Sequence, residues 1–550
     1  MAVNNGSIEQ YLKRLKRDFS QWSVSTALIT LFVSIPTLYI VVQFLRGPGE
    51  SWAHFAQYLL PIYLRNSLYL LLACGVLTII IGVGTAWLST RYDFPWRRSL
   101  EWLLILPLAI PSYITAFAYA GLLDYGGSLE LLTRGVGWDI PKLDIMNIYG
   151  LIFILSISLY PYVYVACRAF FMHQSQNLLE AAQVLGDSDR RSFFRLILPI
   201  SRPAIVGGVV LVAMEVLNDY GAAKYYGINT FTTGIFKSWL DYQEPKTAVY
   251  LAALLLVIIF GLLLWEQLQR RRKRYTSTTK DRKRLLRIRP CRSRRYLFTL
   301  LVSLPVLLGF IIPVAQLVYW AFLAFDVINW TDIFTMIWHS LGVATLAAAC
   351  CVFFAVALLF ASQWNQLRGI NNLAKFGVLG YAIPGAVIAV GVYVPSLFFE
   401  KWMIGVVKNT FSIKIGLFLT GTTVALVYAY VVRFMAVAHN PIAAGKQKIQ
   451  ATLSEASQSL GKKALKTFIK VELPLLRTAL LSAFILVFID VMKELPLTLI
   501  LKPYYLKTLA VEAYQYASDE RIIESAFPAL MIILTGVLPV IFLNRLVRQD

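Results

Sequence analysis

The sequence predicts an all-α integral membrane protein with twelve transmembrane helices arranged as two parallel six-helix repeats. Three observations predict this class. The chain is 58% hydrophobic, only 15% of its residues are charged and its mean hydropathy is +0.63, whereas soluble domains carry roughly 25% charged residues. Its apolar runs can span a hydrocarbon core that needs about 20 helical residues. Several motifs of the first half return in the second half.

The net charge of +22 is compatible with nucleic-acid binding only if the basic residues form one face of a folded domain. Here the Lys and Arg residues lie in short segments between apolar runs. They therefore indicate membrane topology, and no nucleic-acid partner is expected. The five cysteines have neither paired metal-ligand spacing nor an even count, so we interpret them as small buried hydrophobic residues.

The apolar runs divide evenly between the two halves. The first run is longer than the core of a signal peptide, so we expect an uncleaved first span. The predicted segments are a cytosolic N-terminal segment (1–21), a first six-span module (22–269), a polybasic cytosolic linker (270–296) and a second six-span module (297–550). The predicted spans are 23–45, 66–89, 100–122, 148–170, 203–220, 246–267, 297–322, 339–363, 376–398, 414–438, 477–499 and 523–545.

Basic residues gather after the even-numbered spans. Examples are Arg97 and Arg98 after the second span and Arg190 and Arg191 after the fourth. The linker from Arg270 to Arg295 contains fourteen Lys or Arg and one acidic residue. Because positive loops stay inside, these segments and both termini are predicted to be cytosolic. The linker is expected to lie against anionic lipid headgroups.

One loop motif occurs twice, with its matched positions 275 residues apart. In the first copy, residues 175–185 predict a short helix, Gly186 its left-handed end and Pro199 the interruption before the next span. Because each half has an even number of spans, the repeats are parallel. The matched residues are Glu180, Ala181, Ala182, Gly186 and Pro199 in the first copy, and Glu455, Ala456, Ser457, Gly461 and Pro474 in the second; Ile110-Pro111 also matches Ile383-Pro384, at a shift of 273.

This motif, on the cytosolic loop before the penultimate span of a six-span module, resembles the signature of permease subunits of binding-protein-dependent ABC importers. The resemblance implies the type I importer permease fold and makes each loop a coupling helix held by an ATP-hydrolysing subunit. The second copy departs slightly, because Ser457 stands where the signature has alanine.

The chain lacks a G-x-x-x-x-G-K-[ST] stretch, so it cannot cradle nucleotide phosphates by itself. We therefore expect no cofactor in this chain and no enzymatic activity of its own. ATP and magnesium are expected in a partner ATPase. The resemblance implies two copies of that ATP-binding subunit, a periplasmic solute-binding protein and a place in the bacterial inner membrane.

The fifth and eleventh spans each carry two acidic residues. Glu215 and Asp219 match Asp490 and Glu494 at the shift of 275. A spacing of four predicts that each pair shares one helical face. Acidic groups at this depth cost roughly 2.5–3.5 kcal/mol each and usually face a pathway or a partner. The pairs either form an oxygen-rich passage in which the four carboxylates are transient metal ligands, or they pair structurally, with Lys493 neutralising Asp490 or Glu494.

The segments around these residues resemble the fused ferric-iron importer permeases of bacteria. The resemblance rests on Asn218-Asp219-Tyr220-Gly221 and Met492-Lys493-Glu494-Leu495-Pro496. It implies import of iron(III) by alternating access. The nearby Tyr220 either supplies a phenolate oxygen along the pathway, of the kind that iron(III) favours, or is an interfacial aromatic residue. Permeases for thiamine and polyamines are similar here, so another small solute is the alternative within this class. A secondary, ion-coupled transporter without an ATPase is the alternative from a different class.

Overall fold

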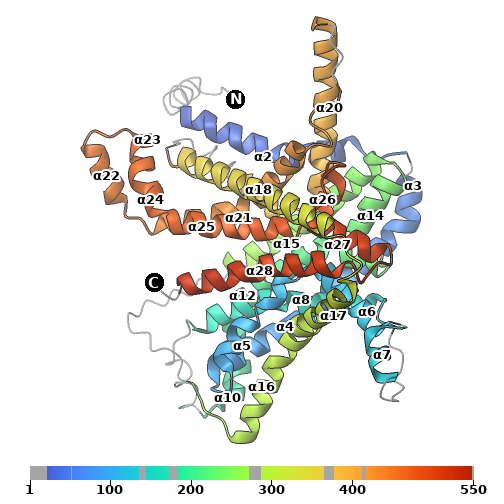
Figure 1. Cartoon of the computed structure of the whole chain (residues 1–550). Helices are drawn as coiled ribbons and strands as arrows, with labels where there is room; N and C mark the ends of the chain where they lie inside the picture. Colours follow the sequence, from blue (N-terminus) through green and yellow to red (C-terminus); the bar gives the residue numbers. More distant parts are fainter. Residues whose placement is uncertain are drawn as a thin grey trace, which may run out of the picture. The chain divides into compact units, whose positions relative to one another are not determined.

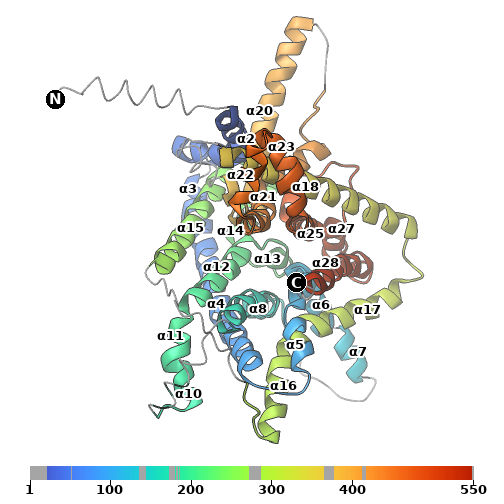
Figure 2. The ribbon, with the colours of Figure 1, turned by 90° about the vertical axis from the view of Figure 1, so that its left-hand side faces the viewer.

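The computed structural model describes residues 21–50, 52–124, 126–134, 144–172, 180, 182, 184, 186–271, 287–364, 377–411 and 416–547 (Figures 1 and 2). Within these ranges the regular elements are helices, and the one β-bridge joins Tyr92 and Ile288. The chain divides into two compact units. Unit 1 contains residues 1–48, 334–511 and 538–550, and unit 2 contains residues 49–333 and 512–537.

Unit 2 is built mainly from the first half of the chain. The helices α4 and α8 pack against each other more extensively than any other pair, and α12 packs on both of them. Its elements are α3 (Trp52–His54), η1 (Phe55–Leu59), α4 (Leu60–Arg91), α5 (Arg97–Leu103), η2 (Leu106–Ala109), α6 (Ser112–Leu123), α7 (Ser128–Arg134), α8 (Ile148–Met172), α10 (Asp189–Ser192), η3 (Phe193–Ile197), α11 (Leu198–Ile200), α12 (Arg202–Asn218), α13 (Gly221–Tyr225), α14 (Phe231–Phe236), η4 (Lys237–Asp241), α15 (Pro245–Arg271), α16 (Arg292–Val306), η5 (Leu307–Ile311) and α17 (Ile312–Ala324).

Unit 1 is built mainly from the second half, and α21 packs along α25 and against η6. Three helices cross the boundary between the units: α18 (Trp330–Trp364), α27 (Leu509–Ser518) and α28 (Ala526–Val547). The other elements of unit 1 are α2 (Gln21–Arg46), η6 (Val378–Ala382), α20 (Gly385–Phe411), α21 (Thr423–Gln447), α22 (Ala451–Ser459), α23 (Ala464–Thr467), η7 (Phe468–Glu472), α24 (Leu473–Leu475), α25 (Arg477–Met492) and α26 (Pro496–Leu501).

Each unit contains the first span of the opposite half. The helix α2 packs on α20 and α21 of unit 1, while α16 and α17 pack on α4, α5 and α6 of unit 2. Glycines permit both close approaches: a Cβ on Gly391 would lie 2.9 Å from Ile40, and one on Gly121 would lie 2.3 Å from the Trp320 ring. The compact units therefore combine segments from both halves of the sequence, which the run of apolar segments did not predict.

The twelve predicted spans all correspond to helices. Eight helices are long and apolar enough to cross a membrane, and three further pairs do so if each bent pair is one span. The remaining predicted span corresponds to α28. Three boundaries differ from expectation. The third and ninth spans break at Pro111 and Pro384. The tenth span begins only at Thr423. The carboxylate of Glu400 accepts the N–H groups of the residues before it, Phe418, Leu419 and Thr420, and holds them in a loop.

The crossing of α2 over α20 depends on the missing side chain of Gly391. We predict that Gly391→Leu lowers the stability of the permease by about 1–3 kcal/mol, because the added carbons collide with Pro36 and Ile40. The matched control is Gly405→Leu on the same helix, where an added Cβ meets nothing within 4 Å. The melting temperature of the detergent-solubilised chain measures the effect. Equal melting temperatures for the two variants would contradict the packing.

Candidate functional site

The two copies of the loop motif end in the same backbone turn. In the second copy α22 is followed by Gly461 at φ 80°, and the N–H of Lys462 donates to the carbonyl of Ser457 at 3.3 Å. In the first copy Gly186 has φ 87°, and the N–H of Asp187 donates to the carbonyl of Ala182 at 3.0 Å. This is the helix-ending turn that a left-handed glycine permits. The glycine role predicted from sequence is confirmed.

The same side of the motif faces solvent in both copies. Glu180 and Glu455 are exposed, whereas Ala182 and Ser457 are buried. Most of the helix predicted over 175–185, including Ala181, lies outside the described residues. In the second copy the helix is complete, and Ala456 is exposed beside Glu455. The motif therefore presents its glutamate outward and packs its third residue inward.

Both loops lead into the next long helix through matched bends. The segment Asp189–Ile200 meets α12 at 67°, and Ala464–Leu475 meets α25 at 73°. Each bend falls two residues after the matched prolines, at Ser201 and Leu476. The predicted interruption near Pro199 and Pro474 is therefore found, slightly later than expected.

The inner faces of the two loops are built differently. In the second copy the hydroxyls of Ser457 and Thr467 are 3.0 Å apart, while Glu472 accepts a hydrogen bond from Ser454 at 2.6 Å and pairs with Lys446 at 2.5 Å. Burial raises the pKa of the Glu472 carboxyl, but the contacts from Lys446 and Ser454 outweigh it and hold the pKa below its usual range. The Ser457 hydroxyl thus has a partner, Thr467, that an alanine at this position would not contact by a hydrogen bond.

The first copy has apolar or unpaired groups at the matched positions. Ile197 and Phe171, which correspond to Glu472 and Lys446, are both buried. The Ser192 hydroxyl, which corresponds to Thr467, is buried with no hydrogen-bond partner among the described residues. The inner face of this loop is therefore held mainly by apolar packing.

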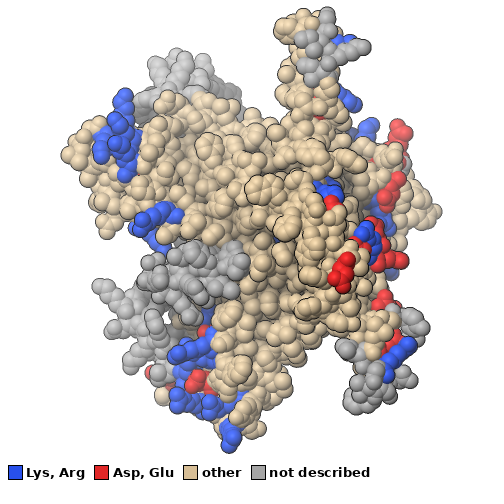
Figure 3. Space-filling view, viewed as in Figure 1, with Lys and Arg blue, Asp and Glu red and all other residues tan. Residues whose placement is uncertain are grey.

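Basic residues gather at the loop-bearing end of each unit. Figure 3 shows Lys and Arg over α22 to α24 in unit 1 and over the region of α10 and α16 in unit 2. In the sequence these include Lys462, Lys463 and Lys466 in the second copy, and Arg190 and Arg191 in the first.

The first acidic pair lies where the fifth span breaks. The helix α12 ends at Asn218 and Asp219 has an extended backbone (φ −65°, ψ 120°), so the prediction that it shares a helical face with Glu215 is wrong. The carboxylate of Asp219 accepts a hydrogen bond from the Ser112 hydroxyl, and another from the N–H of Ala223 at 3.0 Å. These donors are available because the chain leaves the helix. Glu215 accepts a hydrogen bond from the Tyr162 hydroxyl at 3.3 Å.

The second acidic pair is neutralised by cations. Glu494 follows the end of α25 and pairs with Arg433 at 3.2 Å, with both side chains at most 7% exposed. It also accepts the N–H of Leu497 at 2.9 Å. Asp490 pairs with Lys493 at 2.9 Å. Of the two sequence interpretations, structural pairing therefore applies to the second half, with Lys493 serving Asp490.

Sequence reasoning missed Arg433, the partner of Glu494. It lies within the tenth span, 61 residues before Glu494 in the chain. Its signal was available, because a charged residue inside an apolar run requires a partner. Its position in the first repeat is occupied by Ser158.

A serine and a glycine account for the difference between the acidic sites. Gly385 corresponds to Ser112 at the shift of 273. A Cβ on Gly385 would lie 2.0 Å from the Arg433 guanidinium and 2.4 Å from the Glu494 carboxylate. The second repeat therefore accommodates a cation where the first repeat has a hydroxyl.

Tyr220 is 7% exposed, and its ring stacks on Phe236 with centroids 3.7 Å apart. Its ring is thus packed into unit 2. Within the described ranges, no three His, Cys, Asp or Glu side chains lie close enough together to hold a metal ion. The four carboxylates proposed as transient ligands belong to different units as two pairs: Glu215 and Asp219 in unit 2, Asp490 and Glu494 in unit 1.

The buried ion pair yields a stability test. We predict that Arg433→Met destabilises the permease by about 3–5 kcal/mol, because it leaves Glu494 buried without its cation. The double variant Arg433→Met/Glu494→Gln should recover most of this loss, since the amide oxygen still accepts the N–H of Leu497. Thermal unfolding in detergent measures both variants. A double variant as unstable as the single one would show that the charge pairing is not the cause.

Comparison with known proteins agrees with this arrangement of repeats. Residues 78–274 and 373–550 each match the family described as binding-protein-dependent transport system inner membrane component. The chain is 25% identical to the Fe(3+)-transport system permease protein FbpB 2 of Haemophilus influenzae over 523 residues, covering 94% of this chain and 96% of that protein.

Sulfate permeases each match less than half of the chain. The sulfate transport system permease protein CysT of Escherichia coli is 28% identical over 255 residues, covering 43% of this chain and 88% of that protein. CysW of the same organism is 31% identical over 201 residues, covering 36% and 67%. With two family domains and apolar helices throughout, the chain belongs to the binding-protein-dependent transport system inner membrane components, and it is a multi-pass permease of an ABC importer.

Proposed function

We propose that this permease carries iron(III) from a periplasmic binding protein to the cytosol. The surroundings of Asp219 support this proposal most strongly. This carboxylate lies where the fifth span breaks, and its partners are a serine hydroxyl and a backbone amide. Among the described residues no Lys or Arg pairs with it. Carboxylate and hydroxyl oxygens suit a hard cation. The iron-permease relative, which matches nearly end to end, supports the same cargo.

The two acidic sites would then have different roles. Asp219 keeps an uncompensated carboxylate and, with Glu215, offers oxygen ligands to a passing cation. Glu494 and Asp490 are paired with Arg433 and Lys493, so we assign them to holding the break in the eleventh span. The sequence suggested four carboxylates as metal ligands. We retain two of them, Glu215 and Asp219, as ligands of the transported cation.

Sulfate is the competing cargo, because sulfate permeases also match. A passage bearing Glu215 and Asp219 repels a dianion, since like charges at short range in a low-dielectric medium are unfavourable. Thiamine and polyamines, which are cationic, are compatible with the same carboxylates. Measured cargo preference separates these cases.

The two repeated loops are proposed to receive the force of ATP hydrolysis. Their exposed glutamates and matched bends provide two equivalent contact surfaces, one for each of two ATP-binding subunits that bind ATP and magnesium. The basic residues at the loop-bearing ends support a cytosolic position for the loops and, with them, for both termini. Rocking of the long helices would follow from movement of the bends.

A double substitution tests the coupling role. We predict that Glu180→Ala/Glu455→Ala abolishes transport and uncouples ATP hydrolysis, because both exposed anchors are lost, while the chain still reaches the membrane. Uptake in cells and ATPase activity of the reconstituted complex measure this, and immunoblotting of membranes controls for assembly. Full uptake by the double variant would refute the role. Transport by the wild-type chain without any ATPase would instead favour a secondary transporter.

A second substitution tests the cargo. Radioiron uptake should appear in cells that regain this chain, and Asp219→Asn should lower its rate by about tenfold, equivalent to about 1.4 kcal/mol in the barrier. The control is Asp241→Asn, an exposed carboxylate of the same unit. Radiosulfate uptake is measured in parallel. Sulfate uptake without iron uptake, or an unchanged iron rate for Asp219→Asn, would reject the proposed cargo site.

A further inference from the structure

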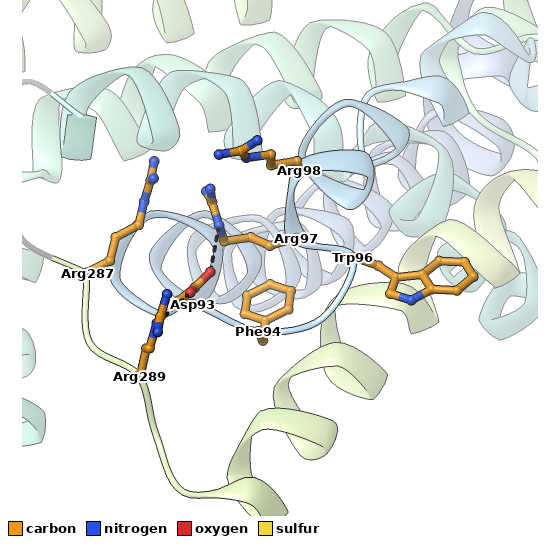
Figure 4. Close-up of a pocket in the computed structure, with 7 residues that line it drawn as sticks. All are labelled: Asp93, Phe94, Trp96, Arg97, Arg98, Arg287 and Arg289. Atoms are coloured by element: carbon orange, nitrogen blue, oxygen red, sulfur yellow. Dashed lines mark hydrogen bonds and ion pairs between the residues drawn. The ribbon is translucent and has the colours of Figure 1, made fainter.

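Unit 2 contains a pocket of about 650 Å³ near the end that carries the repeated loop (Figure 4). We call it the arginine pocket. It is formed by the turn between α4 and α5 together with the last residues before α16. Its lining residues are Asp93, Phe94, Trp96, Arg97, Arg98, Arg287 and Arg289.

Backbone hydrogen bonds hold the two sides of the pocket together. The N–H of Ile288 donates to the carbonyl of Arg91 at 2.9 Å, and the N–H of Asp93 donates to the carbonyl of Ile288 at 2.9 Å. Arg287 and Arg289 therefore flank a bridge that fixes the end of the linker beside the α4–α5 turn. The pocket is a defined junction between segments almost 200 residues apart in sequence.

The charges of the arginine pocket are unbalanced. Asp93 is the one acidic lining residue, and it is shared by Arg289 at 3.2 Å and Arg97 at 3.7 Å. Neither Arg98 nor Arg287 forms an ion pair with any described residue. Figure 4 shows the side chains of Arg97, Arg98 and Arg287 extending to the same side of the pocket. Arg97 also pairs with Glu101, so the positive charge without an acidic partner among the described residues is that of Arg98 and Arg287. Two such guanidinium groups around one hollow repel one another unless an anion lies between them.

The chemistry of the lining selects the anion. Guanidinium groups bind phosphate oxygens in a bidentate manner, and several of them together favour a phosphate over a monovalent ion. Trp96, 79% exposed at the rim, is a residue typical of the headgroup level of a bilayer. We propose that the arginine pocket binds a phosphate group, supplied either by an anionic phospholipid headgroup or by free phosphate.

Occupation of the pocket would act on the repeated loop through Arg91. The guanidinium of Arg91 pairs with Asp189, the first residue of α10, at 3.1 Å, and the carbonyl of Arg91 accepts the N–H of Ile288. A phosphate that neutralises Arg98 and Arg287 removes the repulsion opposing the bridge between the linker and residues 91–93. It thereby stiffens the segment that holds the first copy of the loop.

The test measures backbone hydrogen exchange of residues 91–93 and 287–289 in the full-length chain in lipid nanodiscs. Three conditions are compared: phosphatidylcholine alone, phosphatidylcholine with phosphatidylglycerol, and phosphatidylcholine with millimolar inorganic phosphate. Exchange should slow by about tenfold when the site is filled. Slowing by phosphatidylglycerol alone identifies a lipid headgroup as the source, and slowing by inorganic phosphate identifies free phosphate.

Two charge-matched variants make the result specific. Arg98→Gln/Arg287→Gln changes two exposed pocket residues and should remove the slowing, whereas Arg292→Gln/Arg294→Gln changes two exposed residues of the same linker end outside the pocket and should retain it. The proposal is overturned if neither lipid nor phosphate slows exchange. It is also overturned if both variants lose the effect equally, because general surface charge would then account for it.

Discussion

The constraint on which the structure depends is that polar groups within an apolar span must find partners inside the protein. The fifth and eleventh spans both stop where an acidic residue stands, α12 before Asp219 and α25 before Glu494. A broken helix leaves backbone N–H groups without intrahelical acceptors. Each carboxylate accepts one of them, from Ala223 or Leu497. The break and the acid therefore stabilise each other, which is a reason for both to recur in the two repeats.

The repeats differ in how they treat the remaining charge. Ser112 donates one hydrogen bond to Asp219 and leaves its charge in place, whereas Arg433 compensates the charge of Glu494. In the second half a Cβ on Gly385, the counterpart of Ser112, would lie 2.0 Å from the Arg433 guanidinium, so a side chain there would displace the arginine from its present position. The two sites thus differ at two matched positions, where Ser112 and Ser158 of the first repeat correspond to Gly385 and Arg433 of the second.

The sequence predicted those features that depend on local pattern. Hydropathy located twelve spans, and Gly186 and Gly461 marked two turns because only a left-handed residue closes them. It did not predict the exchange of first spans between units, since hydropathy carries no information on which helices pack together. It placed Asp219 on a helix because a spacing of four is helical only while the helix continues. Arg433 was missed because its partner is distant in sequence, although its burial within an apolar run was a signal.

The two loops show which surfaces of a duplicated protein can diverge. Their outer faces keep Glu180 and Glu455 at the same spacing and exposure, as contact with two copies of one ATPase subunit would require. Their inner faces differ, because each needs only to be satisfied within its own unit. Asp189, which joins the first loop to the arginine pocket through Arg91, corresponds to Ala464 in the second. A ligand in that pocket would therefore act on one loop alone, so the two loops would differ in how a ligand affects them.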